Sequence, residues 1–249
     1  MRLRFKTDEG WGGRATLGLI VLQADETIEP ELRAYTARNG VVLYHSRIPS
    51  GLDVTPESLA QMEAEIPGSV GLLPAHLGFD VIGYGCTSGA TIIGAKNVAR
   101  AIHSVKPAAA TTDPLTAVKA ALEALGAKKI GFVTPYIADV SAAMRQNLEA
   151  SGFEVAGFGS FEQSEERKVA RIDAGSVRRA ILDVGAEAPC DAVFISCTNL
   201  RTQELIADTE ATLSKPVIAS NQVLAWHMLR LAEIHDTPTG FGRLFGCPL

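Results

Sequence analysis

The sequence predicts an α/β protein made of two similar halves, each a parallel β-sheet with helices packed against it. Short apolar runs alternate with helical patterns along the whole chain, which is typical of parallel sheets. The pattern also repeats at long range. Residues 17–21 resemble residues 130–134, and residues 82–87 resemble residues 193–198. Two equivalent half-domains are therefore expected.

The chain of 249 residues is long enough for two units with cores of their own. We expect an N-terminal arm at residues 1–14 and a first half-domain at residues 15–112 that residues 223–249 complete. The second half-domain is expected at residues 113–222. If the halves pack about a pseudo-twofold axis, equivalent turns face each other across a cleft.

The first half begins with a strand. The apolar run at residues 16–22 indicates a strand covered on both faces, and a helix should begin near Pro30 and end at Asn39-Gly40. The later elements are a strand at 41–46, helices at 56–62 and near 72–77, a strand at 81–85, a helix at 90–103 and a strand at 107–112.

The second half begins with a helix. Asp113 should cap this helix, with Pro114 in its first turn and Gly126 as its end. The later elements are a strand at 129–134, a turn at 135–139, a helix that runs to 150, a strand at 153–158, a polar loop at 159–171, a helix at 174–184, a strand at 192–196, a helix at 201–213, a strand at 216–220 and a helix at 222–232.

Charge and hydropathy exclude several kinds of partner. The net charge is −5 and no basic run exceeds two residues, so neither nucleic acid nor an anionic membrane is expected as a partner. No apolar run reaches the roughly 18 residues that span a bilayer. The charged, glycine-rich start lacks the apolar core of a signal peptide, so we expect a cytoplasmic protein. Apolar helix faces favour a homo-oligomer.

Two of the four cysteines occupy equivalent places in the repeat. Cys86 and Cys197 each follow a strand and precede a threonine. Ligands bind at the carboxyl edge of a parallel sheet, and a helix amino end there favours the thiolate. A lone cysteine after a strand is usually a packing residue, but an equivalent pair favours a functional site. Cys190 and Cys247 are expected to be structural.

No metal site is expected. None of the cysteines forms a Cys-x-x-Cys pair, and the five histidines have no metal-ligand spacing. The cysteines are therefore expected to be free thiols.

Two opposed thiols support three reactions. They can remove a proton from one face of a carbon and return one to the other face, which is racemisation or epimerisation without a cofactor. One thiolate can instead add to an activated double bond, allow rotation and leave, which is cis–trans isomerisation. A thiol can also protonate the enediolate left by loss of CO₂, which is decarboxylation. A non-catalytic binding protein on the same scaffold is the remaining alternative.

All three reactions require groups that hold a substrate carboxylate. Small hydroxyl and amide residues follow the two cysteines and offer N–H and O–H donors. They are Thr87, Ser88, Thr198 and Asn199. Tyr136 is either a packed ring with its hydroxyl in solvent or a further carboxylate donor. Asp25 and Glu26 are either helix-capping acids or substrate contacts.

These features resemble the aspartate/glutamate racemase superfamily, and within it the branch of maleate isomerase and arylmalonate decarboxylase. The resemblance covers about residues 14–245. It is carried by the first strand and its turn, both cysteine turns, Thr134-Pro135-Tyr136, and residues 170–173, 216–222 and 240–245. The resemblance implies two Rossmann-like, flavodoxin-related halves with the active site in the cleft between them and no metal or organic cofactor. It implies that Cys86 is the nucleophile or first acid/base, that Cys197 is the second, and that Tyr136 binds a carboxylate.

The chain departs from this branch in two ways. Arylmalonate decarboxylases keep a cysteine only at the second turn, so the presence of both favours an isomerase or a racemase. Maleate isomerases carry an asparagine in the first turn, where this chain has Asp25, and another asparagine in the region of residues 162–168. A carboxylate at position 25 repels a dicarboxylate and suits an amino group. This turn is most similar to the ectoine-utilisation protein subfamily, whose proposed substrates are acylated diamino acids.

The sequence therefore predicts a cofactor-independent isomerase, either like maleate cis–trans isomerase or an amino-acid racemase. Its substrate is expected to be a small carboxylic acid or a compound derived from an amino acid. An arylmalonate-type decarboxylase is the enzymatic alternative.

Overall fold

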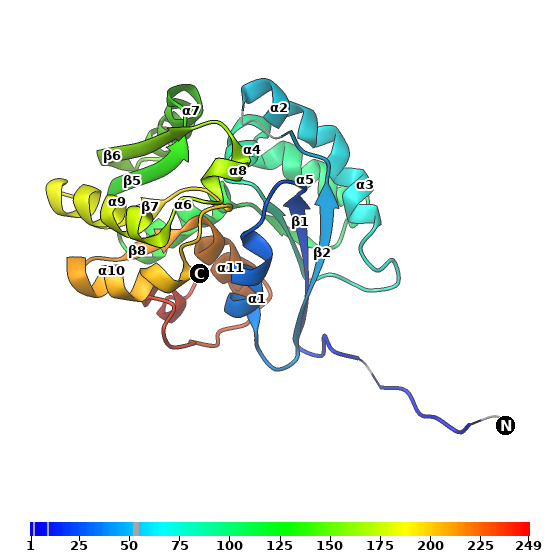
Figure 1. Ribbon diagram of the computed structural model, residues 1–249. Coiled ribbons are helices and arrows are strands. Elements are labelled where there is room, and N and C mark those ends of the chain that lie inside the picture. The colour runs from blue at the N-terminus through cyan, green and yellow to red at the C-terminus, as the bar shows by residue number, and fades with distance from the viewer. Residues whose placement is uncertain (2, 9, 52–54) are drawn as a thin grey trace.

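The computed structural model describes residues 1, 3–8, 10–51 and 55–249 and contains two four-stranded parallel sheets (Figure 1). Two residues of the predicted N-terminal arm, at positions 2 and 9, lie outside this description. The first sheet has the order β2 (Val41–Ile48), β1 (Ala15–Leu22), β3 (Val81–Gly85) and β4 (Ala110–Thr112). The second has the order β6 (Glu154–Gln163), β5 (Lys129–Tyr136), β7 (Ala192–Ile195) and β8 (Val217–Ala219). The shared order confirms the predicted α/β fold and its internal repeat.

Helices cover both faces of the first sheet. α3 (Ile66–Gly71) and α5 (Ala95–His103) pack together on one face, and α1 (Ile28–Thr36) and α11 (Ser220–Leu231) pack together on the other. The sheet is therefore buried on both sides, which explains why β1 is an unbroken apolar run. The other elements of this half are α2 (Pro56–Gln61), the short 3₁₀ turn Met62–Glu65 and α4 (Thr87–Ile93).

The second sheet is covered in a similar way. α9 (Ala174–Glu187) packs on β5, β6 and β7, and α10 (Ile206–Leu213) packs beside it on β8. α7 (Ala138–Ala150) packs on β5 and β6 and also contacts α4 of the first half. The other elements are α6 (Pro114–Ala124), α8 (Glu166–Val169) and the 3₁₀ turns Gln203–Leu205 and Arg243–Gly246.

Two equivalent helices join the halves. α6 and α11 each follow the last strand of a sheet, and they pack against one another. α11 also packs against α1 and β3 of the first half, although it follows β8 of the second. The assignment of residues 223–249 to the first half-domain stays a prediction, but these contacts support it. Trp226 on α11 is completely buried at this junction.

Parallel register places both cysteines at equivalent edges. Leu17 pairs with Val81 in the first sheet, and Ile130 pairs with Ala192 in the second. Since β3 and β7 run parallel to their neighbours, the residue that follows each strand lies at the carboxyl edge of its sheet. This is the edge at which open α/β sheets bind ligands.

Several predicted helix boundaries were wrong. The helix expected near residues 72–77 is instead α3, which ends at Gly71 because Pro74 lacks a backbone donor for a further turn. The single helix expected at 90–103 is two helices. They meet at Gly94, whose φ of +86° ends α4 and begins α5.

The loop predicted at residues 159–171 contains regular structure. β6 continues to Gln163, and α8 begins at Glu166, two residues beyond the strand. Glycines and small polar residues in β6 hid the strand, but its pairing with β5 extends to Tyr136 and Gln163. Pro135 and Tyr136, expected in a turn, therefore end β5.

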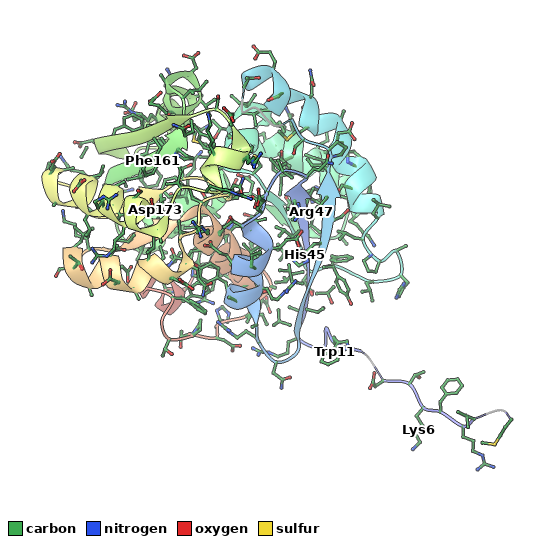
Figure 2. All side chains as sticks on the ribbon, in the orientation of Figure 1. Lys6, Trp11, His45, Arg47, Phe161 and Asp173 are labelled. Atoms are coloured by element: carbon green, nitrogen blue, oxygen red, sulfur yellow. The ribbon has the colours of Figure 1, made fainter. Side chains whose placement is uncertain are left out.

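The N-terminal arm extends away from the body of the protein, and Lys6 and Trp11 lie on it (Figures 1 and 2). Trp11 is 86% exposed, whereas the residues of β1 are buried. No helix in the described part of the chain has both the length and the apolar character needed to cross a bilayer.

Loss of the Asp113 cap should destabilise the junction between the halves. Its Oδ1 accepts the backbone N–H groups of Leu115 and Thr116 at 2.8 and 3.0 Å, as the sequence predicted for a cap. Asp113→Ala should lower the free energy of unfolding by about 1–2 kcal/mol, measured by urea denaturation. Asp113→Asn keeps the acceptor and should lose less. Equal losses in the two variants would contradict this role.

Candidate active site

Cys86 lies at the carboxyl edge of the first sheet, between β3 and α4. Its side chain is buried, and its Sγ accepts a hydrogen bond from the Gly89 backbone N–H at 3.1 Å. A Cβ atom at position 89 would lie 3.0 Å from this sulfur and 2.6 Å from the Tyr84 hydroxyl, so the close approach requires glycine. The Ser88 hydroxyl lies 3.5 Å from the same sulfur. The first predicted turn thus surrounds a buried thiol with polar groups.

Cys197 occupies the equivalent position after β7. It is also buried, and its Sγ accepts a hydrogen bond from the Asn199 backbone N–H at 3.3 Å. Its φ is +119°, a value that a residue with a Cβ rarely adopts, whereas Cys86 has an ordinary extended φ of −151°. The two turns are therefore equivalent in position but differ in backbone strain.

Ser220 connects the two cysteine turns. Its hydroxyl oxygen accepts hydrogen bonds from the Thr87 hydroxyl at 2.8 Å and from the Cys197 backbone N–H at 3.0 Å. The Thr198 hydroxyl of the second cysteine turn donates to the Gly85 carbonyl, which precedes Cys86 in the first turn, at 3.4 Å. All these groups are buried. The structure therefore brings together the two turns that the sequence repeat predicted to face each other.

Tyr136 lies within the same site. Its side chain is only 2% exposed, so its hydroxyl is not in solvent. Burial and Glu166 raise the pKa of Cys197, and a hydrogen bond from the Tyr136 hydroxyl to the sulfur opposes this rise. Burial raises the pKa of Tyr136 well above its ordinary value, and the nearby Cys197, Glu166 and Cys86 raise it as well. The ring thus presents one donor to a site shared by both thiols.

Asp25 and Glu26, the two acids of the first turn, lie in different environments. Asp25 is buried, and its Oδ1 accepts the backbone N–H groups of Thr27 and Ile28 at 2.8 Å each, which caps the start of α1. Glu26 is exposed and pairs with Arg171 at 2.8 Å. Only the backbone N–H of Glu26 points inward, where it donates to Asn199 Oδ1 at 2.9 Å. The structure therefore buries Asp25 near enough to influence the pKa of both thiols, and leaves the Glu26 carboxylate at the surface.

Glu166, which the sequence reasoning missed, supplies a second buried acid. Its Oε2 accepts a hydrogen bond from Asn199 Nδ2 at 2.7 Å. Burial, together with the negative charge of Asp25, raises the pKa of Glu166 to about 7. α8 carries this residue into the region between the halves (Figure 1). Nothing in a polar segment with three glutamates marks one of them as buried.

The pKa of both thiols is raised, whereas the sequence led us to expect that a helix end lowers it. Burial, together with the nearby Glu166 and Asp25, raises the pKa of Cys86 to about 12. The hydrogen bonds from Ser88 and Gly89 oppose this shift but are weaker. Burial and the same two carboxylates also raise the pKa of Cys197 well above its ordinary value. Desolvation therefore outweighs the local donors.

The other two cysteines lie apart from this site. All four are free thiols, as predicted. Cys190 is buried at the amino end of β7, where Lys215 Nζ lies 3.8 Å from its sulfur. Cys247 lies near the end of the chain and is partly exposed.

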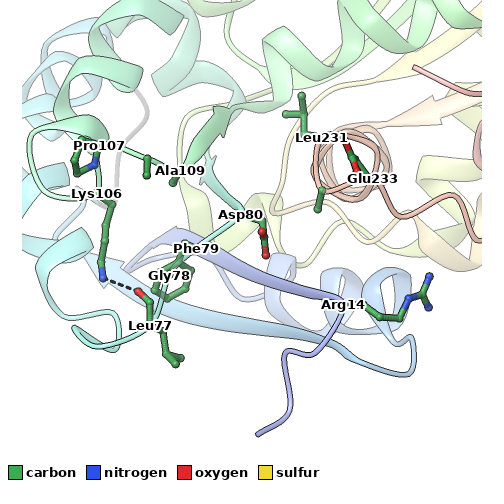
Figure 3. A pocket seen from close by; sticks show the side chains of 12 residues that line it. Arg14, Leu77, Gly78, Phe79, Asp80, Lys106, Pro107, Ala109, Leu231 and Glu233 are labelled. Atoms are coloured by element: carbon green, nitrogen blue, oxygen red, sulfur yellow. Dashed lines mark hydrogen bonds between the residues drawn. The ribbon is translucent and has the colours of Figure 1, made fainter. Parts of the chain in front are cut away.

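A large surface cavity lies at the opposite edge of the first sheet (Figure 3). It has a volume of about 670 Å³, and Arg14, Asp80, Lys106 and Glu233 are among its lining residues. Asp80 precedes β3 whereas Cys86 follows it, so the length of this strand, about 16 Å, separates the cavity from the thiol. Size alone therefore does not identify the site, and the clustered thiols and acids do.

The difference in backbone strain predicts opposite effects of glycine at the two cysteines. Cys197→Gly should be more stable than Cys197→Ala by about 1 kcal/mol, because glycine adopts a positive φ freely. At position 86 the order should reverse, with Cys86→Ala the more stable by a similar amount. Thermal and urea unfolding of the four variants would test this. The same order at both positions would contradict the strain at Cys197.

Comparison with known proteins agrees with this geometry. The model of the arylmalonate decarboxylase family matches residues 73–245. Maleate isomerase of Pseudomonas putida is 26% identical over 92% of this chain and 96% of its own. Maleate isomerase of Nocardia farcinica is 27% identical over 93% of this chain and 96% of its own.

A solved structure shows the same fold. It is a mutant of the Nocardia farcinica maleate cis–trans isomerase with a covalently bound succinylcysteine intermediate. It has a TM-score of 0.83 at 24% identity and covers 93% of this chain and 98% of that chain. The resemblance that the sequence motifs indicated is confirmed. The chain belongs to the arylmalonate decarboxylase family, in the branch of the aspartate/glutamate racemase superfamily that includes the maleate isomerases.

Proposed function

We propose that the protein is a cofactor-independent isomerase of a small carboxylic acid, with Cys86 and Cys197 as its two reacting groups. The observation that carries this proposal is the joining of the two equivalent thiol turns through Ser220. Both sulfurs also influence the same buried Tyr136 hydroxyl. The maleate isomerases, which match this chain over nearly its whole length, support an isomerase of carboxylic acids.

Each residue of the site has a proposed role. The Tyr136 hydroxyl and the donors beside the thiols would hold the substrate carboxylate. The donors beside the thiols belong to Thr87, Ser88, Thr198 and Asn199. In a racemisation, one cysteine as thiolate takes the proton from the substrate carbon while the other, as thiol, gives its proton to the opposite face. The two cysteines then exchange protonation states, and the reverse reaction uses the same groups.

Cis–trans isomerisation is the second reaction that this geometry supports. A thiolate would add to the double bond, and the electron pair would move into the adjacent carboxylate as an enediolate. Rotation about the resulting single bond and loss of the thiolate would give the other isomer. The succinylcysteine intermediate in the Nocardia farcinica enzyme supports this candidate.

Replacement of either cysteine should slow isomerisation strongly. For racemisation in D₂O, Cys86→Ala and Cys197→Ala should each slow interconversion of enantiomers by about 10²–10⁴-fold, measured by proton NMR and chiral chromatography. A panel of amino acids, their N-acetyl forms and maleate would distinguish the reactions. Conversion of maleate to fumarate with a covalent adduct on one cysteine would indicate cis–trans isomerisation, and release of CO₂ from an arylmalonate would indicate decarboxylation.

The matched control is Cys190→Ala, which removes a buried thiol outside the site and should leave the rate unchanged. Turnover that survives both single replacements would refute the proposed roles of Cys86 and Cys197. Absence of turnover with every compound in the panel would refute an isomerase of these substrate classes.

The raised pKa of Glu166 should appear in the pH dependence of stability. The folded state holds this proton up to about pH 7, whereas the unfolded chain releases it near the ordinary glutamate pKa of 4.5. Wild-type stability should therefore fall relative to Glu166→Gln as pH rises between these values, by at most about 3 kcal/mol. Urea denaturation at pH 4.5 and pH 8 tests this. Glu165→Gln, which changes an exposed neighbour, should show the wild-type slope, and a shared slope in all three proteins would contradict the shift.

A further inference from the structure

We infer that the N-terminal arm is a dimerisation segment, which pairs with the same arm of a second copy of this chain. The inference concerns a part of the molecule outside both sheets, so it does not depend on the proposed reaction. Three observations carry it. They are an exposed apolar face on the arm, a cavity between the arm and the first sheet, and a charge pattern that is complementary to itself.

The arm has the pattern of a β-strand with one apolar face. Its odd positions include Leu3, Phe5 and Trp11, which are 69%, 79% and 86% exposed. Its even positions include the charged residues Arg4, Lys6 and Asp8. Alternation with a period of two places the apolar side chains on one side of an extended chain and the charges on the other. The arm extends away from the body of the protein, where this apolar side meets solvent (Figures 1 and 2).

This concentration of exposed apolar side chains is specific to the arm. In the rest of the described chain, the exposed large apolar residues are scattered singly along the sequence. They are Leu72, Val105, Phe158 and Leu249. Single exposed apolar residues are normal on a protein surface, whereas several that lie together mark an interaction site.

A cavity of about 560 Å³ lies between the arm and the body. Val42 and Tyr44 on β2 line its body side together with Pro74 and Leu77, and arm residues between positions 6 and 12 line the other side. β2 is an edge strand, because it pairs with β1 on one side and ends the sheet on the other. An edge strand with apolar side chains is a ready template for a further strand. The cavity therefore has room for apolar side chains that a partner supplies.

The charge pattern indicates that this partner is a second arm. If two arms run antiparallel about a twofold axis at Thr7, Lys6 of each arm lies opposite Asp8 of the other. The same register places Leu3 of each arm opposite Trp11 of the other. Odd positions share one face, so Leu3 and Phe5 of the second copy lie on the side of Trp11 and can enter the cavity. This pairing is isologous, so it closes at a dimer.

The contact area is sufficient for a weak dimer. Phe5 and Trp11 each bury roughly 150–250 Å² when covered, so the four rings of two arms bury roughly 600–1,000 Å². Leu3 and the paired backbones bring this toward the about 1,200 Å² of small stable interfaces. We therefore expect a dissociation constant on the order of micromolar.

A membrane surface fits the arm less well. Arg14 pairs with Asp236, which leaves three basic residues in the arm, together with two acids. Polybasic segments that bind anionic lipid carry about four to eight basic residues. The alternation of the arm also differs from the helical period of an amphipathic membrane helix.

The first test measures the mass of the full chain by sedimentation equilibrium. The wild type should be a dimer at about 100 μM, and Phe5→Asp/Trp11→Asp should raise the dissociation constant by at least about 100-fold. Both side chains are exposed in the single chain, so circular dichroism of this variant should match the wild type. Leu249→Asp changes an exposed apolar residue outside the arm and should leave the dissociation constant unchanged.

The second test exchanges charges between the two arms. Lys6→Glu and Asp8→Lys should each weaken the dimer by about tenfold, because each places like charges opposite one another at two points of the interface. The double variant Lys6→Glu/Asp8→Lys restores opposite charges and should recover wild-type affinity to within about threefold. A different partner surface would not produce this recovery.

The third test uses the symmetry of the register. In a Cys247→Ser background, Thr7→Cys should form a disulfide between two chains under mild oxidation, because residues opposite one another bring their Cβ atoms to about 5 Å. Arg4→Cys is the matched control. The two copies of position 4 lie six residues apart along the paired arms, roughly 20 Å, and should not cross-link.

Three results would overturn the inference. They are a monomeric wild type at about 100 μM, a dimer that persists in Phe5→Asp/Trp11→Asp, and a double charge variant that stays as weak as the single ones. Co-sedimentation of the wild type, but not of Phe5→Asp/Trp11→Asp, with phosphatidylserine vesicles would assign the arm to a membrane and would overturn it as well.

Discussion

The hydroxyl of Ser220 joins two turns that are more than one hundred residues apart in the chain. It accepts one hydrogen bond from Thr87 and another from the Cys197 backbone, and both bonds are buried. A buried hydroxyl that lost its partners would leave unsatisfied groups on both halves. The position of each thiol therefore depends on the other half of the protein. Further from the site, the equivalent helices α6 and α11 pack against each other and also connect the two halves.

Burial controls the chemistry of the site as much as the choice of residues does. Desolvation raises the pKa of Cys86, Cys197 and Tyr136, and Glu166 adds to this rise in all three. A helix end or a few N–H donors cannot offset it, since a pKa shift by full burial exceeds a shift by one or two hydrogen bonds.

Asn199 shows how one residue connects the elements around the thiols through its backbone and its side chain. Its backbone N–H binds the Cys197 sulfur, its Oδ1 accepts from the Glu26 backbone and its Nδ2 binds Glu166. Its carbonyl also accepts the Thr27 hydroxyl at 3.0 Å. The first turn, α8 and the second cysteine turn are thereby connected through one buried amide.

Local patterns in the sequence determined the strands, the repeat and the pair of cysteines, because apolar runs and strand-to-helix turns are encoded by neighbouring residues. The Asp113 cap and the end of its helix before Gly126 could be predicted for the same reason, whereas the break at Gly94 and the end of α1 at Thr36 were missed. Tertiary structure alone decided which acids are buried. Asp25 and Glu26 are adjacent in the chain, yet one faces the thiols and the other pairs with Arg171 at the surface. Glu166 lies in the site because β6 and α8 bring it to Asn199, which is 33 residues further along the chain. The pKa of each thiol was likewise beyond sequence reasoning, since desolvation depends on everything packed around the sulfur and not on the turn that carries it.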